Sequence, residues 1–169
     1  MPMLRRAVPR GHPGAARAHP LRPATRVYPA AGESVPQARQ FVTAALTGWG
    51  LGAVADDAAL VTSELAANAA RHGAGTAHPQ ILVRVTRVRL GAVIEVGDHD
   101  PAGPPWPPPE PGPDDENGRG LRVVLAVAHR AGWRRDRDWK IMWAEVRVPR
   151  PARPRPWHRP AAPAASVPR

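Results

Sequence analysis

The sequence predicts an α+β fold, a two-layer sandwich in which helices lie on one face of a mixed, mostly antiparallel sheet. In the first part of the central region, apolar residues recur at helical spacing; in the next part they alternate with polar residues, as in strands. A third helical segment and further strand-like segments follow a long proline-rich stretch. Helices and strands grouped in this way are typical of α+β domains rather than of strictly alternating α/β domains.

The first helix is expected between Ser34 and Trp49, where the apolar residues are spaced three or four apart. Ser34 is a suitable N-cap, and Pro36 fits the first turn, where a missing N–H removes no helical hydrogen bond. Gly50 and Gly52 follow the last apolar residue of the pattern and are expected to end the helix.

The second helix is expected to start at Asp56 or Asp57 and to end at Gly73. Glu64 and Asn68 are four residues apart, so they share one face of this helix. A carboxylate can accept a proton, and an amide oxygen can bind Mg²⁺, a hard cation that often keeps phosphates among its ligands. Taken alone, the same spacing is more typical of a solvated amphipathic helix.

The remaining segments are read from the same two periodicities. Residues 80–86 alternate apolar and polar side chains, and a turn near Gly91 leads to a second strand-like run. The expected elements are strands over residues 80–86 and 92–96, a helix over 120–131, a short strand or turn over 134–138, and a closing strand over 140–148.

A proline-rich loop, residues 101–117, separates the second strand from the third helix. Eight of its first thirteen residues are proline, so it cannot form a helix or a central strand. A loop of this length inside a compact domain is usually functional or disordered. It lies between Asp98 and the pair Gly118 and Gly120, whose backbone N–H groups are open to a phosphate at a helix start. A simple helix-entry turn explains the two glycines about as well.

The formal net charge of +10 belongs to the two ends of the chain. Residues 1–30 hold six arginines and residues 149–169 hold five, with no acidic residue in either range. The 13 basic and 14 acidic side chains of residues 31–148 nearly cancel, so the folded part would not attract nucleic acid by charge alone. Both ends are rich in Pro, Ala and Arg, which predicts disordered tails flanking a domain at residues 31–148.

Several functional classes are excluded by composition. The sequence has no cysteine, so disulfides, thiol catalysis and cysteine-ligated zinc are ruled out. No stretch approaches 18 apolar residues, and the N-terminus has no apolar core of signal-peptide length. We therefore expect a cytoplasmic protein with no membrane partner and no specific nucleic-acid partner.

Four segments occur in the order and spacing of a known family. They are ELAANAARHG at residues 64–73, VGDHDP at 96–101, ENGRGL at 116–121 and WKIMWAEV at 139–146. They resemble, in turn, the first box, the adenine box, the phosphate box and the last strand of the gyrase, chaperone and histidine-kinase ATPase superfamily. The chain resembles its small stand-alone ATP-binding proteins, with the Bergerat fold, and most of all the bacterial anti-sigma-factor serine kinases.

The resemblance implies ATP and Mg²⁺ as ligands and gives each box a role. Glu64 would be the general base, and Asn68 would coordinate the Mg²⁺ that bridges the triphosphate. Asp98 would accept a hydrogen bond from the adenine amino group. The residues implied to line the phosphates are Gly118, Arg119 and Gly120.

The resemblance also makes residues 101–117 the lid over ATP, and it shows where this chain departs from the family. The adenine box is normally Asp-x-Gly-x-Gly, but Asp100 and Ala102 occupy the two glycine positions here. Ile141 stands where the family often has a threonine that supports adenine. These departures bear on nucleotide affinity more than on the fold.

Three classes of function follow. The first is a serine/threonine kinase that phosphorylates a small anti-sigma antagonist, or that acts as an anti-sigma factor by sequestering a sigma factor; the family also allows a homodimer. The second is a nucleotide-dependent protein-binding module without phosphotransfer. The third is a nucleic-acid or membrane-surface binder acting through the arginine-rich ends. The presence of Glu64 favours the first class.

Overall fold

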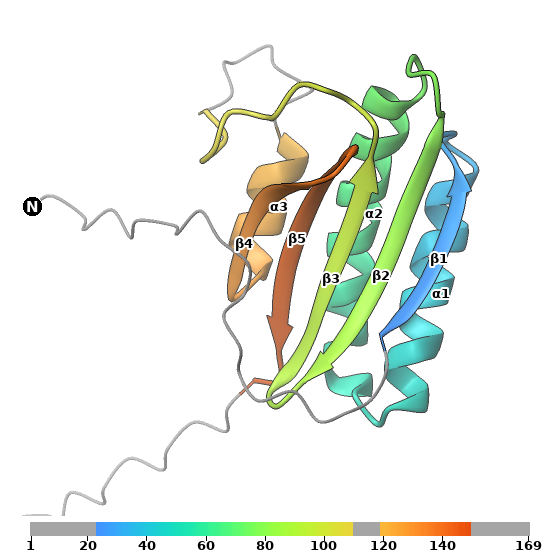
Figure 1. The fold of residues 1–169 in the computed structure, drawn as a ribbon. Coiled ribbons are helices and arrows are strands. Elements are labelled where there is room, and N and C mark those ends of the chain that lie inside the picture. The colour runs from blue at the N-terminus through green and yellow to red at the C-terminus, as the bar shows by residue number, and fades with distance from the viewer. Residues whose placement is uncertain (1–22, 110–118, 150–169) are drawn as a thin grey trace, which may run out of the picture.

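The computed structural model describes residues 23–109 and 119–149 of the 169-residue chain. Figure 1 shows a curved sheet with helices packed behind it. In chain order the elements are β1 (Ala24–Pro29), α1 (Ser34–Gly48), the short 3-10 helix η1 (Gly52–Val54), α2 (Ala55–Gly73), β2 (Gln80–Val88), β3 (Gly91–Asp98), α3 (Arg119–Val127), β4 (Arg130–Asp136) and β5 (Trp139–Arg147).

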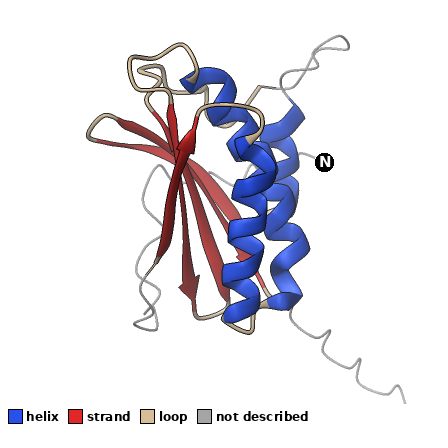
Figure 2. Cartoon of the chain, turned by 90° about the vertical axis from the view of Figure 1, so that its right-hand side faces the viewer, coloured by secondary structure: helices blue, strands red, loops and turns tan. Residues whose placement is uncertain are grey.

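The sheet has five strands in the order β1-β2-β3-β5-β4, and every neighbouring pair is antiparallel. The helices cover one face of this sheet, as the side view in Figure 2 shows. The predicted α+β sandwich is therefore confirmed. The expected mixture of strand directions is wrong for the described residues, because all four strand pairings are antiparallel.

Strand β1 was missed by the sequence analysis, which assigned residues 1–30 to a disordered tail. Residues 24–29 instead pair along their whole length with β2, from Ala24 opposite Val85 to Pro29 opposite Gln80. The strand lies at the sheet edge, where most of its side chains are exposed, and even Val27 is 50% exposed. The sequence of β1 therefore lacks the apolar–polar alternation that marks a half-buried strand. The folded domain thus begins before residue 31. The rest of the predicted tails, residues 1–22 and 150–169, lies outside the described residues.

Two helix boundaries also differ from the expectation. Ser34 is not the N-cap of α1; it is buried inside the first turn, where its hydroxyl donates a hydrogen bond to the Pro29 carbonyl at 2.8 Å. The third helix ends at Val127 rather than at residue 131, because Arg130 already pairs with Glu145 at the start of β4. Strand pairing, a tertiary effect, overrides the helical spacing of the apolar residues there.

The hydrophobic core fills the space between the helices and the sheet. Helix α2 lies centrally, in contact with α1, α3 and strands β2, β3 and β5. Its buried face is rich in alanine, which lets the helix approach its neighbours closely. The core residues from the sheet include Ile81, Val83 and Val85 of β2, and Ile94 and Val96 of β3. Within the described residues, no helix is both long and apolar enough to span a bilayer.

The end of this core is where polar groups gather. The C-terminal end of α2 packs against the end of β3, since a Cβ added at Gly73 would lie 3.2 Å from Asp98 Cβ. Asp98 is opposite Lys140 in the β3–β5 ladder. Asp98 continues the row of Ile94 and Val96, so the pair faces the helices rather than the open side of the sheet. The fold thus places two charged side chains beside the end of α2.

Candidate functional site

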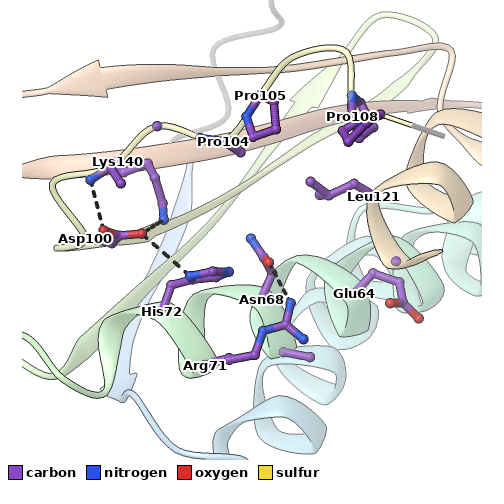
Figure 3. A pocket seen from close by; sticks show the side chains of 15 residues that line it. Glu64, Asn68, Arg71, His72, Asp100, Pro104, Pro105, Pro108, Leu121 and Lys140 are labelled. Carbon is purple, nitrogen blue, oxygen red and sulfur yellow. Dashed lines mark hydrogen bonds and ion pairs between the residues drawn. The ribbon is translucent and has the colours of Figure 1, made fainter. Parts of the chain in front are cut away.

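A pocket of about 650 Å³ opens at this end of the domain. Four segments form its walls: the exposed face of α2, the loop that follows β3, the first turn of α3, and β5 through Lys140. Figure 3 shows Glu64, Asn68, Arg71 and His72 along α2, with the proline-rich loop passing across from them. Segments far apart in the sequence therefore line one cavity.

Helix α2 presents the predicted polar pair to this pocket. Glu64 and Asn68 are both half-buried and both line it, while Leu65 and Ala69 turn into the core. Arg71 Nη2 donates a hydrogen bond to Asn68 Oδ1 at 3.0 Å, which orients the carboxamide. The i, i+4 spacing thus brings the two side chains to the same cavity, as the sequence analysis expected.

The start of α3 lies directly against Glu64. Gly120 lines the pocket, and a Cβ added there would lie 2.5 Å from Glu64 Oε2. A glycine at residue 120 therefore gives the Glu64 carboxylate room at the helix start. Arg119 is exposed and is not among the pocket-lining residues, and Gly118 lies outside the described residues.

Asp98 lies buried at the other end of the site. Its side chain is fully buried, and Oδ1 accepts hydrogen bonds from the Asp100 backbone N–H at 2.9 Å and from Lys140 Nζ at 3.1 Å. Its second oxygen, Oδ2, is buried without a hydrogen-bond partner among the described residues. Burial raises the pKa of Asp98, and the contacts with Asp100 N–H and Lys140 only partly offset it. A buried acceptor left open in this way is costly unless a ligand completes it.

Lys140 was not predicted as a site residue, yet it is the cation of this cluster. It is 2% exposed, lines the pocket, and donates to Asp100 Oδ2 at 2.8 Å as well as contacting Asp98. Burial tends to raise the pKa of Asp100, but hydrogen bonds from Lys140 and from the Ala102 N–H outweigh it and lower the pKa overall. His72 Nδ1 lies 3.7 Å from the same Asp100 oxygen. Only the β3–β5 register places Lys140 opposite Asp98, and the sequence alone does not give that register.

The described part of the proline-rich loop closes one side of the pocket. Gly103 packs against the ring of Trp133, so closely that a Cβ there would overlap it. Arg135 Nη2 donates a hydrogen bond to the Pro101 carbonyl at 2.6 Å. Pro104 and Pro108 then line the cavity opposite α2 (Figure 3). The role of residues 101–117 as a lid stays a prediction, and residues 110–117 lie outside the described residues.

The donor set around the pocket suits a cation that brings most of its own ligands. Among residues 23–109 and 119–149, no group of three or more His, Cys, Asp or Glu side chains could hold a metal ion. The pocket does offer the Asn68 carboxamide oxygen beside a volume large enough for a phosphate-bearing ligand. These residues therefore fit Mg²⁺ delivered with a nucleotide better than a resident metal.

Comparison with known proteins identifies the domain. Residues 28–144 match the family described as "Histidine kinase-like ATPase domain". The chain belongs to this family. The match begins within β1 and ends within β5, so it includes at least part of every strand and all the residues that line the pocket. As a member of an ATPase domain family, the chain carries a domain type that binds ATP, which supports ATP as the ligand of the pocket.

Among the solved structures that the chain is similar to is the Acinetobacter baumannii histidine kinase AdeS. The identity is 14% and the TM-score 0.38, over 76% of this chain and 69% of the AdeS chain. No curated protein matches the sequence.

Proposed function

We propose that this chain is an ATP-dependent serine/threonine kinase of regulatory type, which phosphorylates a small anti-sigma antagonist protein or acts on a sigma factor as an anti-sigma factor. The observation that carries the proposal is that one cavity joins a carboxylate and a carboxamide on α2 to the glycine start of α3. At its other end lie Lys140, which lines the cavity, and its buried partner Asp98, which has an open acceptor oxygen. This arrangement can hold a nucleotide at both ends, by its base and by its phosphates.

In the proposed reaction, the γ-phosphoryl group lies near Glu64 and Gly120, at the start of α3. Glu64 accepts the proton of a serine or threonine hydroxyl, whose oxygen then forms a bond to the γ-phosphorus while the bond to the ADP oxygen breaks. Asn68 would hold Mg²⁺, which supplies charge neutralisation for the phosphates. Arg71 orients the Asn68 carboxamide by its hydrogen bond to Oδ1. The phosphorylated protein, ADP and a proton carried by Glu64 are the products.

A second candidate function is a nucleotide-dependent protein-binding module that transfers no phosphate. It is favoured by one observation, the pairing of Asp100 with Lys140 at 2.8 Å, where the family usually has a glycine. This ion pair lies beside Asp98, at the end of the pocket opposite Glu64 (Figure 3). The two functions therefore differ in whether Glu64 acts on an acceptor.

Label transfer from radioactive ATP separates the two functions. We expect the purified chain with Mg²⁺ to label a small acceptor protein with an exposed serine or threonine. Glu64→Gln keeps the size and hydrogen-bonding capacity of the side chain but cannot accept a proton, so transfer should fall by about a hundredfold to ten-thousandfold while ATP still binds.

Glu33→Gln is the matched control, because Glu33 is exposed at the start of α1 and does not line the pocket. It should transfer at the wild-type rate. Equal rates for wild type and Glu64→Gln would remove Glu64 as the base. Tight ATP binding with no labelled acceptor across a broad panel would favour the binding module.

A further inference from the structure

We propose that Lys140 recognises the nucleotide base together with Asp98. In this arrangement Asp98 Oδ2 accepts a hydrogen bond from the amino group of adenine, and the Lys140 ammonium donates one to a ring nitrogen beside that amino group. The inference deepens the proposed function, because it rests on ATP occupying the pocket. It makes Lys140 a specificity-determining residue.

The geometry leaves Lys140 one donor to use. An ammonium group has three N–H donors. Two of them are directed to carboxylate oxygens, Asp98 Oδ1 at 3.1 Å and Asp100 Oδ2 at 2.8 Å. The side chain is 2% exposed and lines the pocket, so its third donor has little access to bulk water. A ligand in the pocket is the partner in reach.

Asp98 supplies the complementary acceptor. Its Oδ2 is buried without a hydrogen-bond partner in the described part of the chain, while Oδ1 already accepts two hydrogen bonds. Because Asp98 and Lys140 are opposite each other in the β3–β5 ladder, the open acceptor and the remaining donor belong to neighbouring side chains on one face of the sheet.

Adenine offers the matching pair of groups. Its exocyclic amine is a donor, and each of the two ring positions that flank it, N1 and N7, carries a nitrogen acceptor. A carboxylate oxygen and an ammonium group side by side can therefore bind either edge. Position N3 is remote from the amine and is not part of either edge.

A purely structural role for Lys140 makes a different prediction. If the ammonium only neutralises Asp98 and Asp100, removing a ring nitrogen from the ligand changes nothing, and changing Lys140 weakens all adenine nucleotides to the same extent. A ligand series on the unmodified protein separates the two roles without requiring any variant to fold.

The experiment measures Kd by calorimetry for ATP, 1-deaza-ATP, 7-deaza-ATP and 3-deaza-ATP, each with Mg²⁺. A hydrogen bond to a charged group predicts that either 1-deaza-ATP or 7-deaza-ATP binds about tenfold to a hundredfold more weakly than ATP, while 3-deaza-ATP matches ATP. If ATP binds and all three analogues bind equally well, the inference is overturned and the proposed ATP binding stands. If no nucleotide binds, the inference and the proposed function both fail.

Two further measurements address Lys140 itself. Lys140→Met should abolish the difference between ATP and the sensitive analogue, whereas Arg89→Met, which removes an exposed cation at the β2–β3 turn, should retain it. Lys140 is also the only lysine in the sequence, so labelling with side-chain ¹⁵N-lysine gives a single ammonium signal. That signal should shift on saturation with ATP, and an unchanged signal would overturn the inference even if the methionine variant does not fold.

Discussion

Buried carboxylates occur on both faces of the sheet, and their partners differ. Glu95 and Glu145 lie on the face away from the helices, because their neighbours Ile94, Val96, Ala144 and Val146 belong to the core on the other side. Asp98 lies on the helix-facing side, at the end of β3. All three side chains are at least 95% buried.

On the face away from the helices, which we call the open face, each oxygen of Glu95 and Glu145 contacts a separate guanidinium group. Glu95 Oε1 accepts a hydrogen bond from Arg134 at 2.9 Å, and Oε2 lies 3.6 Å from Arg84. Glu145 Oε2 accepts one from Arg130 at 2.8 Å, and Oε1 accepts one from Arg147 at 2.6 Å. All four carboxylate oxygens of Glu95 and Glu145 thus have a guanidinium partner without any ligand, although Nε of Arg134 is buried with no hydrogen-bond partner among the described residues.

Asp98 differs because only one of its oxygens has partners. Oδ1 accepts two hydrogen bonds, and Oδ2 accepts none from the described residues. Burial alone therefore does not distinguish a structural carboxylate from a binding one. We propose that the distinguishing feature of a binding carboxylate is an acceptor oxygen that the fold leaves without a partner beside a cavity.

The largest effect should come from Asp98→Ala. If Oδ2 binds the base, ATP with Mg²⁺ at a hundredfold excess over Kd should add about 2.7 kcal/mol to the unfolding free energy of wild type, and the variant should lose most of that gain. The variant should still fold without ATP, because Lys140 keeps its hydrogen bond to Asp100. Thermal unfolding with and without ATP measures both quantities.

The control for this prediction is Glu95→Gln, since Glu95 is also buried but lies on the other face. It should retain the full ATP-dependent gain. A full gain in Asp98→Ala would rule out Asp98 as the base-binding residue.

On the open face we expect a smaller effect, and it should change stability in the absence of ATP rather than the gain on ATP binding. Glu95→Gln should lower the unfolding free energy in the absence of ATP by about 1–2 kcal/mol, because it removes the charge that pairs with Arg134 and Arg84. The loss is limited because these arginine side chains are still 19% and 33% exposed. Asp98→Asn should lower the unfolding free energy by less than Glu95→Gln does, because it also removes the desolvation penalty of a buried charge. Denaturant unfolding of both variants measures the difference. The reverse ranking would contradict the comparison.

The clusters also predict how stability depends on pH. Burial tends to raise the pKa of Glu145, but hydrogen bonds from Arg130 and Arg147 outweigh it and lower the pKa. A group whose pKa is lowered by folding stabilises the protein above its ordinary value, here 4.5, and loses that contribution as the pH falls. The pH dependence from Asp98 has the opposite sign, because burial raises its pKa. The contribution of Asp98 to stability therefore falls as the pH rises through its raised pKa.

Denaturant unfolding across the acidic range tests this sign. The stability of Glu145→Gln should vary less between pH 6 and 3 than that of wild type, because the variant has lost a carboxylate that binds fewer protons in the folded state. An unchanged slope would show that the arginine contacts of Glu145 do not favour its charged form in solution.

Most of the fold was predictable because the signals were local. Helical spacing located α1 and α2, alternation located β2, and strand-like sequence was also recognised for β3 and β5. Strand β1 was missed because its stability comes from pairing with β2 at the sheet edge, not from a pattern of its own. Strand β4 was partly assigned to a helix because pairing with β5, 15 residues away at Arg130 and Glu145, decides its conformation.

The candidate site shows the same division. Glu64 and Asn68 reach one cavity because a helix fixes their relative positions, and Asp98 could be placed at a strand end. Lys140 could not be placed without the register between β3 and β5, which a single sequence does not contain. The roles of these residues in catalysis and binding stay predictions.

The smallest effect on stability is expected for Gly120→Ala, although its effect on function should be clear. Alanine favours a helix more than glycine does, so the unfolding free energy should change by no more than about 1 kcal/mol. The new Cβ would lie 2.5 Å from Glu64 Oε2, and that flexible carboxylate can rotate away from it. We therefore expect phosphotransfer to fall while ATP affinity changes little.

Gly75→Ala is the matched control, because nothing lies within 4 Å of a Cβ at that position. It should leave ATP binding and transfer unchanged. If Gly120→Ala instead loses ATP affinity, the glycine acts by letting the phosphates approach the backbone at the start of α3. If it transfers phosphate at the wild-type rate, the observed position of Glu64 is not the one that matters for catalysis. Either result shows whether the phosphate end of the nucleotide lies at the start of α3. The pair of Asp98 and Lys140 lies at the other end of the pocket.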